Sequence, residues 1–153
     1  MNIFITSNCP VESAKFLDDK RSNKMLLESA QLLCSAINEH GGKAPYRTTH
    51  RNHPSSVWCR ATRDNWDWLF QHYVALCDEY TRRSGKIHKS SLMQEELLSQ
   101  RHFIPEGDLT PFANCARNLS KGVDFTHEKD VTIAYQLYLS ERWETDVREP
   151  VWS

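Results

Sequence analysis

The chain has 153 residues, of which 39% are hydrophobic and 25% are charged. That length fits one domain with a substantial core, and that composition excludes a disordered chain or a collagen-like repeat. The 19 basic and 20 acidic residues give a formal net charge of -1 with neutral histidines, so any binding of nucleic acid must use a local basic patch.

Cysteine spacing and hydropathy narrow the class of protein further. The five cysteines show no CxxC spacing, which argues against a disulfide framework and a structural zinc site. Residues 1–6 lack the basic region of a signal peptide, and no apolar run reaches the roughly 20 residues that span a bilayer. We therefore expect no membrane association and a cytoplasmic location. The sequence indicates no cofactor and leaves homo-oligomerisation open.

The predicted elements of the N-terminal third are one extended segment and two helices. Residues 2–6 are β-branched and aromatic and predict a short extended segment. Pro10 is typical of a first helical position, and a short helix to about Leu17 is followed by a polar break over residues 18–23. A helix over residues 24–40 then ends at Gly41-Gly42. Its apolar stripe is formed by Leu26, Ala30, Leu33 and Ile37.

Beyond a polar loop over residues 43–53, the pattern predicts further helices. A short helix begins at Pro54, and a long helix capped by Asp64 ends at Arg82-Arg83. Helices are also predicted over residues 91–100 and 128–142, on either side of an irregular segment over 102–126. The expected fold is all-α, a mainly helical single domain over residues 1–153 with room for one short N-terminal strand. The long helix carries an apolar face of Trp66, Leu69, Phe70, Tyr73, Cys77 and Tyr80.

The polar loop is the first candidate site. It carries Arg47, His50, Arg51 and His53 just before a helix N-terminus, and such a combination of cations and backbone amides is suited to phosphate. A solvated connector explains the same composition equally well. The two histidines have HxxH spacing without a third ligand nearby, so we expect no metal site.

Glu28 is the second candidate. It follows Lys24 by four residues and Arg21 by seven on the polar side of its helix. A carboxylate among cations keeps its charge, which suits the stabilisation of a cationic sugar intermediate. The alternative is a surface ion pair with Lys24, although lysine before glutamate is the weaker order, worth a few tenths of a kcal/mol.

Tryptophans are the third candidates, because exposed bases stack on aromatic rings. Trp66 lies on the apolar face of its helix and is predicted to be part of the core. Trp68 falls on another face of the same helix, and it is therefore the better stacking candidate.

With these residues identified, the chain resembles the pyrimidine-dimer DNA glycosylases of phages and bacteria (the endonuclease V-like family), in particular its phage branch. The similar stretches are Tyr46 to Pro54, Trp58-Cys59-Arg60, Cys77 to Gly85, and the helix from Lys24 to Gln31. Short phage proteins labelled as members begin Met-Asn-[Val/Ile]-Phe and share the His-Pro-Ser-x-Val-Trp segment. The resemblance covers residues 1–90 and, more loosely, the C-terminal end.

The resemblance implies a mechanism in which the N-terminal α-amine attacks the sugar C1′ and forms a Schiff base that permits strand cleavage. An amine with a reference pKa of about 7.7–8.0 is partly neutral at neutral pH. Asn2 is too bulky for efficient removal of the preceding methionine, so the implied catalytic groups are the amine of Met1 and the carboxylate of Glu28. The candidate binding residues are Arg21, Lys24, Arg47, His50, Arg51, His53, Arg60 and Trp68. Of these, the resemblance implies that Arg21, Lys24, Arg47, Arg51 and His53 converge near Glu28.

Two functions follow as hypotheses. The first is a DNA-repair-type glycosylase and AP lyase that acts on damaged or modified pyrimidines in DNA. The second is a non-catalytic phage counter-defence protein that sequesters a nucleotide, or a nucleic acid, in the same basic pocket. The near-zero net charge favours a small nucleotide for this second role, because such a ligand needs only two or three cations. Binding to a host protein and a purely structural role remain less specific options.

Overall fold

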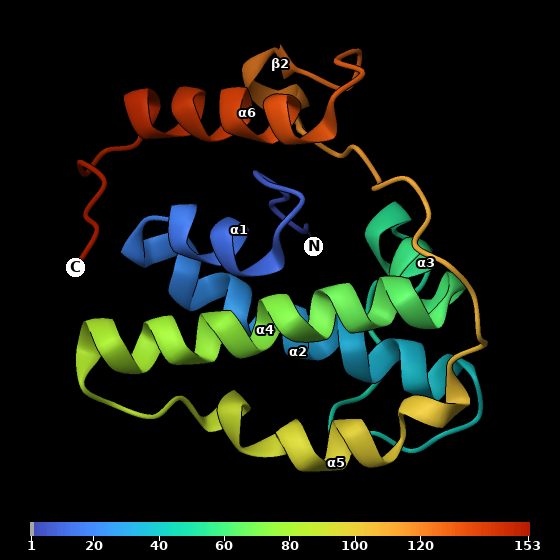
Figure 1. Ribbon diagram of the computed structural model, residues 1–153. Coiled ribbons are helices and arrows are strands. Elements are labelled where there is room, and N and C mark those ends of the chain that lie inside the picture. Colours follow the sequence, from blue (N-terminus) through green and yellow to red (C-terminus); the bar gives the residue numbers. More distant parts are fainter. Residues whose placement is uncertain (1) are drawn as a thin grey trace.

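The computed structural model describes residues 2–153, and over this range the chain is mainly helical, as predicted (Figure 1). The six α-helices are α1 Pro10–Phe16, α2 Asp19–Glu39, α3 Pro54–Ala61, α4 Arg63–Ser84, α5 Gln94–Ser99 and α6 Val131–Thr145. Short 3-10 turns occupy Lys89–Met93, Arg101–Phe103 and Leu119–Lys121. The two antiparallel strands β1 Arg117–Asn118 and β2 Val123–Asp124 pair Arg117 with Asp124. No helix in residues 2–153 is long and apolar enough to cross a membrane.

The core lies where the two long helices, α2 and α4, pack side by side (Figure 1). Trp66 of α4 is fully buried, and its indole N–H donates a hydrogen bond of 3.2 Å to the carbonyl of Leu33 in α2. Phe70 is only partly buried and packs against the edge of this core. The predicted shared core of the two helices is thereby confirmed, with the buried side chains of Leu26, Ala30, Leu33, Ile37, Leu69, Tyr73 and Cys77.

Two helix starts differ from the prediction. The expected polar break over residues 18–23 is wrong, because α2 begins at Asp19. Arg21 within this stretch is buried between the carboxylates of Asp18, at 3.2 Å, and Asp146, at 2.8 Å. The polar residues of this stretch thus belong to the first turns of α2, where the buried cation is paired on both sides. Helix α4 is capped by Thr62, whose hydroxyl accepts a hydrogen bond from the Asn65 amide, so the predicted cap at Asp64 is also wrong.

The N-terminal segment is extended and buried, but it is not a strand. Ile3, Phe4 and Ile5 are at most 8% exposed, and the segment lies between α6 and the layer formed by α1 and α4 (Figure 1). The Phe4 ring stacks on Tyr138 of α6 with centroids 5.9 Å apart and meets Tyr135 edge-on. Side-chain packing against α6 thus takes the place of the strand pairing that the β-branched composition suggested.

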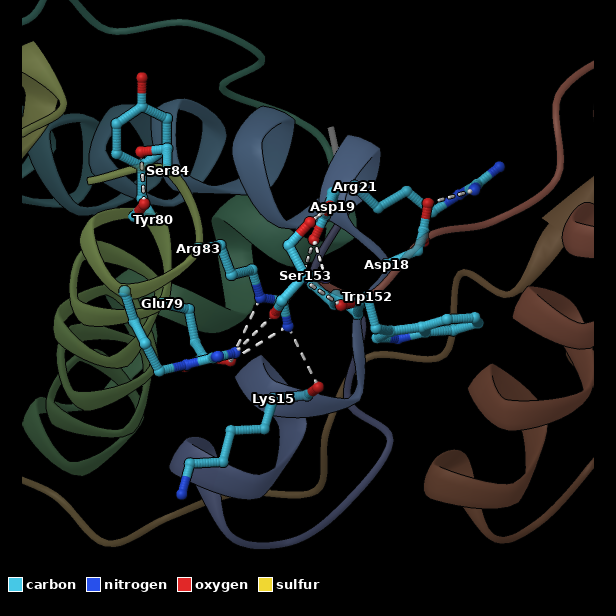
Figure 2. A network of polar contacts seen from close by, with 12 residues as sticks. Lys15, Asp18, Asp19, Arg21, Glu79, Tyr80, Arg83, Ser84, Trp152 and Ser153 are labelled. Atoms are coloured by element: carbon cyan, nitrogen blue, oxygen red, sulfur yellow. Dashed lines mark hydrogen bonds and ion pairs between the residues drawn. The ribbon is translucent and has the colours of Figure 1, made fainter. Parts of the chain in front are cut away.

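A polar network fastens the C-terminal end to the helices (Figure 2). Arg83 of α4 donates hydrogen bonds to the carbonyl of Leu17 and, at 3.0 Å, to the carboxylate of Asp19, and it forms an ion pair with Glu79. The backbone amide and hydroxyl of Ser153 both donate to the same Asp19 carboxylate. Through these groups the end of the chain is tied to α4 and to the start of α2.

Candidate functional site

Glu28 lies in a small cavity of about 210 Å³ between α2, α6 and the N-terminal segment. The glutamate comes from the middle of α2, where the polar side of the helix turns away from α4. Four cationic side chains surround it, from α2 and α6. The cavity is lined by Asn2, Phe4, Lys20, Arg21, Lys24, Met25, Glu28, Tyr138 and Arg142.

The four cations are not equivalent. Arg21 is buried and forms ion pairs with Asp18 and Asp146, and it thereby joins the start of α2 to the end of α6. Lys20 and Lys24 are exposed. Arg142 is half-buried with its guanidinium carbon 6.0 Å from the centroid of the Tyr138 ring, within cation–π range. Lys20, Lys24 and Arg142 are therefore the cations at this cavity that an anionic ligand can reach without breaking a buried ion pair.

A second cavity, of about 560 Å³, lies on the other side of Asn2. His53 caps α3 there, and its Nδ1 accepts a hydrogen bond of 3.1 Å from the Ser55 amide. Burial lowers the pKa of His53, and the charge of His50 lowers it further. A ring that accepts at Nδ1 carries its proton on Nε2 when neutral, and so keeps a donor. The lining residues are Asn2, His53, Pro54, Asn114, Cys115, Arg117 and Thr126.

Asn2 lies at the junction of the two cavities, since it lines both. Its side-chain oxygen accepts a hydrogen bond of 2.6 Å from the Tyr135 hydroxyl, and its side-chain nitrogen donates to the carbonyl of Cys115 at 3.3 Å. The start of the chain is therefore held between the Glu28 side and the His53 side. The predicted catalytic residue Met1 lies outside the described residues.

The remaining residues of the basic loop lie further along α2. Arg51 forms an ion pair of 3.1 Å with Glu39, and its carbonyl accepts a hydrogen bond from Arg60. Glu39 follows Glu28 by eleven residues, which places it on nearly the same face of the helix about 16 Å away. The structure thus brings Arg21 and Lys24 to Glu28 and His53 to the adjoining cavity. It leaves Arg47, His50, Arg51 and Arg60 outside both cavities.

Trp68 has a core environment in this structure. Its side chain is 6% exposed, its ring packs against Trp58, His72 and Phe112, and its indole N–H donates to the carbonyl of Asn8 at 2.8 Å. Stacking on a base would require the ring to leave this cluster. The role of Trp68 in binding stays a prediction.

Several residues of the candidate site were missed in the sequence. The missed cavity residues include Asn114, Arg117, Tyr138 and Arg142, together with Lys20 of α2. Tyr135 of α6 lines neither cavity, but its hydroxyl donates a hydrogen bond to Asn2. The signal that could have found part of this set is the spacing of Tyr135, Tyr138 and Arg142. These residues recur at i, i+3 and i+7, and so share one face of the last helix.

A larger cavity, of about 760 Å³, lies beside the C-terminal segment. Its charge is mixed, because its lining carries the carboxylates of Asp18, Asp19, Asp146 and Glu149 together with the cations of Lys20, Lys121 and Arg148. It includes neither Glu28 nor a residue of the basic loop. Among residues 2–153, no group of three histidine, cysteine or acidic side chains could hold a metal ion. The two cavities that meet at Asn2 hold Glu28 and His53, and they form the candidate site.

Comparison with known proteins adds one finding. A family model described as pyrimidine dimer DNA glycosylase matches residues 1–93. This range holds Asn2, Glu28 and His53, whereas Arg117, Tyr135 and Arg142 lie beyond it. No curated protein and no solved structure matches the chain.

Proposed function

The chain belongs to the pyrimidine dimer DNA glycosylase family, whose model matches 93 of its 153 residues, and on this basis we propose that it is a DNA glycosylase and AP lyase. The proposed substrate is a damaged or modified pyrimidine in DNA. The proposed nucleophile is the α-amine of Met1, and the proposed catalytic carboxylate is Glu28. Its assignment to the phage branch remains a prediction from sequence.

The observation that carries this proposal is the junction at Asn2. Only one peptide bond separates Asn2 from the residue that bears the N-terminal amine, and Asn2 and Glu28 line the same cavity. A chain that used its amine and a carboxylate together would need these two parts near one another, although Glu28 is 26 residues further along the sequence. This proximity supports a shared site.

The proposed chemistry needs a neutral amine and a charged carboxylate. The amine nitrogen forms a bond to the sugar C1′, and the bond from C1′ to the base breaks, so that the base leaves with the electron pair and takes up a proton. Opening of the sugar ring gives a protonated Schiff base between the amine and C1′. The Glu28 carboxylate would stabilise the positive charge that develops on the sugar.

Local cations support DNA as the ligand despite the net charge of -1. Lys20, Lys24 and Arg142 lie at the Glu28 cavity, and Arg117 lies at the adjoining one. Cations on both sides of Asn2 would contact phosphates that flank the reacting sugar, and each phosphate contact contributes to affinity through released counterions. The loop residues Arg47, His50, Arg51 and Arg60 would extend these contacts along α2.

A Glu28→Gln variant tests the proposal, because it keeps the size of the side chain and removes its charge. We expect single-turnover cleavage of a duplex with one abasic site or one pyrimidine dimer to fall by about 100-fold or more. Binding to the same duplex should stay within about twofold, because Glu28 contributes no phosphate contact. The matched control is Glu12→Gln, on the exposed side of α1, which should leave both quantities unchanged.

Cleavage by the Glu28→Gln variant at the wild-type rate would remove the glutamate from the mechanism. Wild-type protein that cleaves neither duplex, while a nucleotide raises its melting temperature, would overturn the enzyme proposal in favour of sequestration. A ligand at a hundredfold excess over Kd stabilises the folded state by about 2.7 kcal/mol, which is readily measured.

A further inference from the structure

The side chain of Asn2 is the centre of a hydrogen-bond network that joins the start of the chain to α6. Its oxygen accepts from the Tyr135 hydroxyl at 2.6 Å and from the Ile3 amide at 3.1 Å. Its nitrogen donates to the carbonyl of Cys115, and the Cys115 amide in turn donates to the Tyr135 oxygen at 3.0 Å. Asn2, Tyr135 and Cys115 thus close a ring of hydrogen bonds.

We propose that Asn2 and Tyr135 are positioning residues, which fix the point from which the N-terminal amine reaches the sugar. The inference rests on the proposed function and assigns a role to the residue that follows Met1. An asparagine there supplies both an acceptor and a donor, so it is anchored on two sides at once. A small residue such as alanine or glycine could make neither bond.

Tyr135 is suited to this role by its environment. Its side chain is fully buried, and burial raises the pKa of its hydroxyl, which therefore stays protonated and keeps donating at physiological pH. Buried polar groups must keep their partners, so the hydroxyl holds Asn2 rather than exchanging it for water. The edge of its ring also packs against Phe4, with centroids 6.0 Å apart.

The expected effect is on the chemical step. The reaction requires the amine at a defined distance and angle from C1′. Misplacement of a reacting group by about 1 Å can lower a rate by about 100-fold. Neither Asn2 nor Tyr135 is cationic, so their loss should leave the phosphate contacts intact.

The test compares Tyr135→Phe and Asn2→Leu with Tyr73→Phe. The control removes another buried tyrosine hydroxyl, which donates to the Ser90 carbonyl in the 3-10 turn Lys89–Met93; neither residue lines either cavity. Asn2→Leu keeps a bulky second residue, so that the methionine stays in place, and mass spectrometry of the intact protein verifies this. The measurements are the single-turnover rate of borohydride-trapped adduct formation on abasic DNA and the Kd for a duplex with a tetrahydrofuran abasic analogue.

We expect both site variants to form adduct about 10- to 100-fold more slowly, with Kd within about twofold of the wild type. Tyr73→Phe should match the wild type in both. The double variant should be no slower than the slower single variant, because the two side chains belong to one ring of hydrogen bonds, which either single substitution already opens.

Two results would be decisive against this inference. One is that the wild type forms the adduct and that the Tyr135→Phe and Asn2→Leu variants form it as fast as the Tyr73→Phe control does. The other is equal loss of rate and of binding in the two site variants, which would indicate general disruption of the fold. Absence of any adduct with the wild type would instead refute the proposed function itself. If Tyr135→Phe does not fold, the comparison of Asn2→Leu with the wild type decides the matter.

Discussion

His72 is a buried neutral histidine that links α4 to the start of α1. Its Nδ1 lies 3.0 Å from the carbonyl of Pro10, its ring stacks on Trp68, and it is 1% exposed. Burial lowers the pKa of His72 from 6.5 to about 4, because an imidazolium in this place would lose its hydration. In the unfolded chain the same ring would bind a proton at a higher pH.

This difference predicts a pH-dependent stability. Between pH 6.5 and 4 the unfolded state binds more protons at residue 72, so the free energy of unfolding should fall as the pH falls through this range. The full difference in pKa corresponds to roughly 3 kcal/mol. His53, whose pKa is also lowered by burial, adds to the slope in the same direction. Urea denaturation at several pH values measures the effect.

The matched variant is His72→Asn, which keeps a side-chain N–H for the Pro10 carbonyl and cannot be protonated. Its unfolding free energy should vary less with pH between 6.5 and 4 than that of the wild type. A variant curve that runs parallel to the wild-type curve would mean that His72 is already protonated in the folded state.

The individual site residues that could be predicted from the sequence are those whose spacing along one helix makes them neighbours. Glu28 and Lys24 share the polar side of one helix, and four residues of separation on a helix implies neighbouring side chains. Arg142 reaches the same cavity from α6, and no spacing rule relates it to Glu28. Likewise, the position of Trp68 in its helix indicated a face other than the apolar face of Trp66. It could not show that Trp58 and Phe112, which come from other parts of the chain, cover that face.

The helices could be predicted where apolar residues recur at helical spacing. The residues at which the helices begin and end were harder to predict. The stripe from Leu26 to Ile37 and the glycines after it were sufficient to identify α2 and its end. Its first turn depends on Asp146, which lies 125 residues further along the chain from Arg21. The N-terminal segment, which pairs with no strand of residues 2–153, is a second example of dependence on distant residues. Its apolar side chains are buried because they pack against α6.

The contact between α4 and the α1–α2 junction should depend on Glu79 (Figure 2). Hydrogen bonds from Arg82 and then Arg83 hold the pKa of the Glu79 carboxyl below its usual value. Glu79→Gln would leave the Arg83 guanidinium, 4% exposed, with less compensation. We expect a loss of about 3 kcal/mol, the lower end for breaking a buried pair, because Arg83 keeps Asp19.

Chemical denaturation at pH 7 measures this loss. The neighbouring variant Asp78→Asn is the control, since Asp78 is exposed on the same helix, and it should change the unfolding free energy by no more than about 0.5 kcal/mol. Equal stability of Glu79→Gln and the control would show that the ion pair contributes nothing to the junction.

Over the whole molecule, charge is distributed unevenly. Four cations line the Glu28 cavity and Arg117 lines the adjoining one, whereas the larger cavity at the C-terminal segment carries four carboxylates beside three cations. A protein with net charge -1 should therefore bind duplex DNA through few phosphates and weakly at physiological salt.

Lys24→Ala tests this distribution. It should weaken binding to any duplex sequence and reduce the slope of log Kobs against log salt concentration by about 1. Lys86→Ala, in the exposed turn after α4 and outside both cavities, is the control and should change neither value. A Lys24→Ala variant with the wild-type salt slope would place the DNA elsewhere on the surface.

The position of the chain after residue 93, relative to the two cavities, could not be predicted from the sequence. The family model ends at residue 93, and the irregular segment after it has no periodicity from which a position could be inferred. Yet this part completes both cavities, through Cys115, Arg117 and Tyr138 among others. Its placement depends on long-range contacts, such as Tyr135 with Asn2, that join residues 133 positions apart.

The most direct measurement is the identity of the atom that becomes attached to DNA. Wild-type protein is incubated with a duplex that contains one abasic site, the adduct is reduced with borohydride, and the digested protein is examined by mass spectrometry. We expect the sugar remnant on the α-nitrogen of Met1, and we expect acetylation of that nitrogen to abolish the adduct. An adduct on the side chain of Lys20 or Lys24, or no adduct at all, would contradict this expectation.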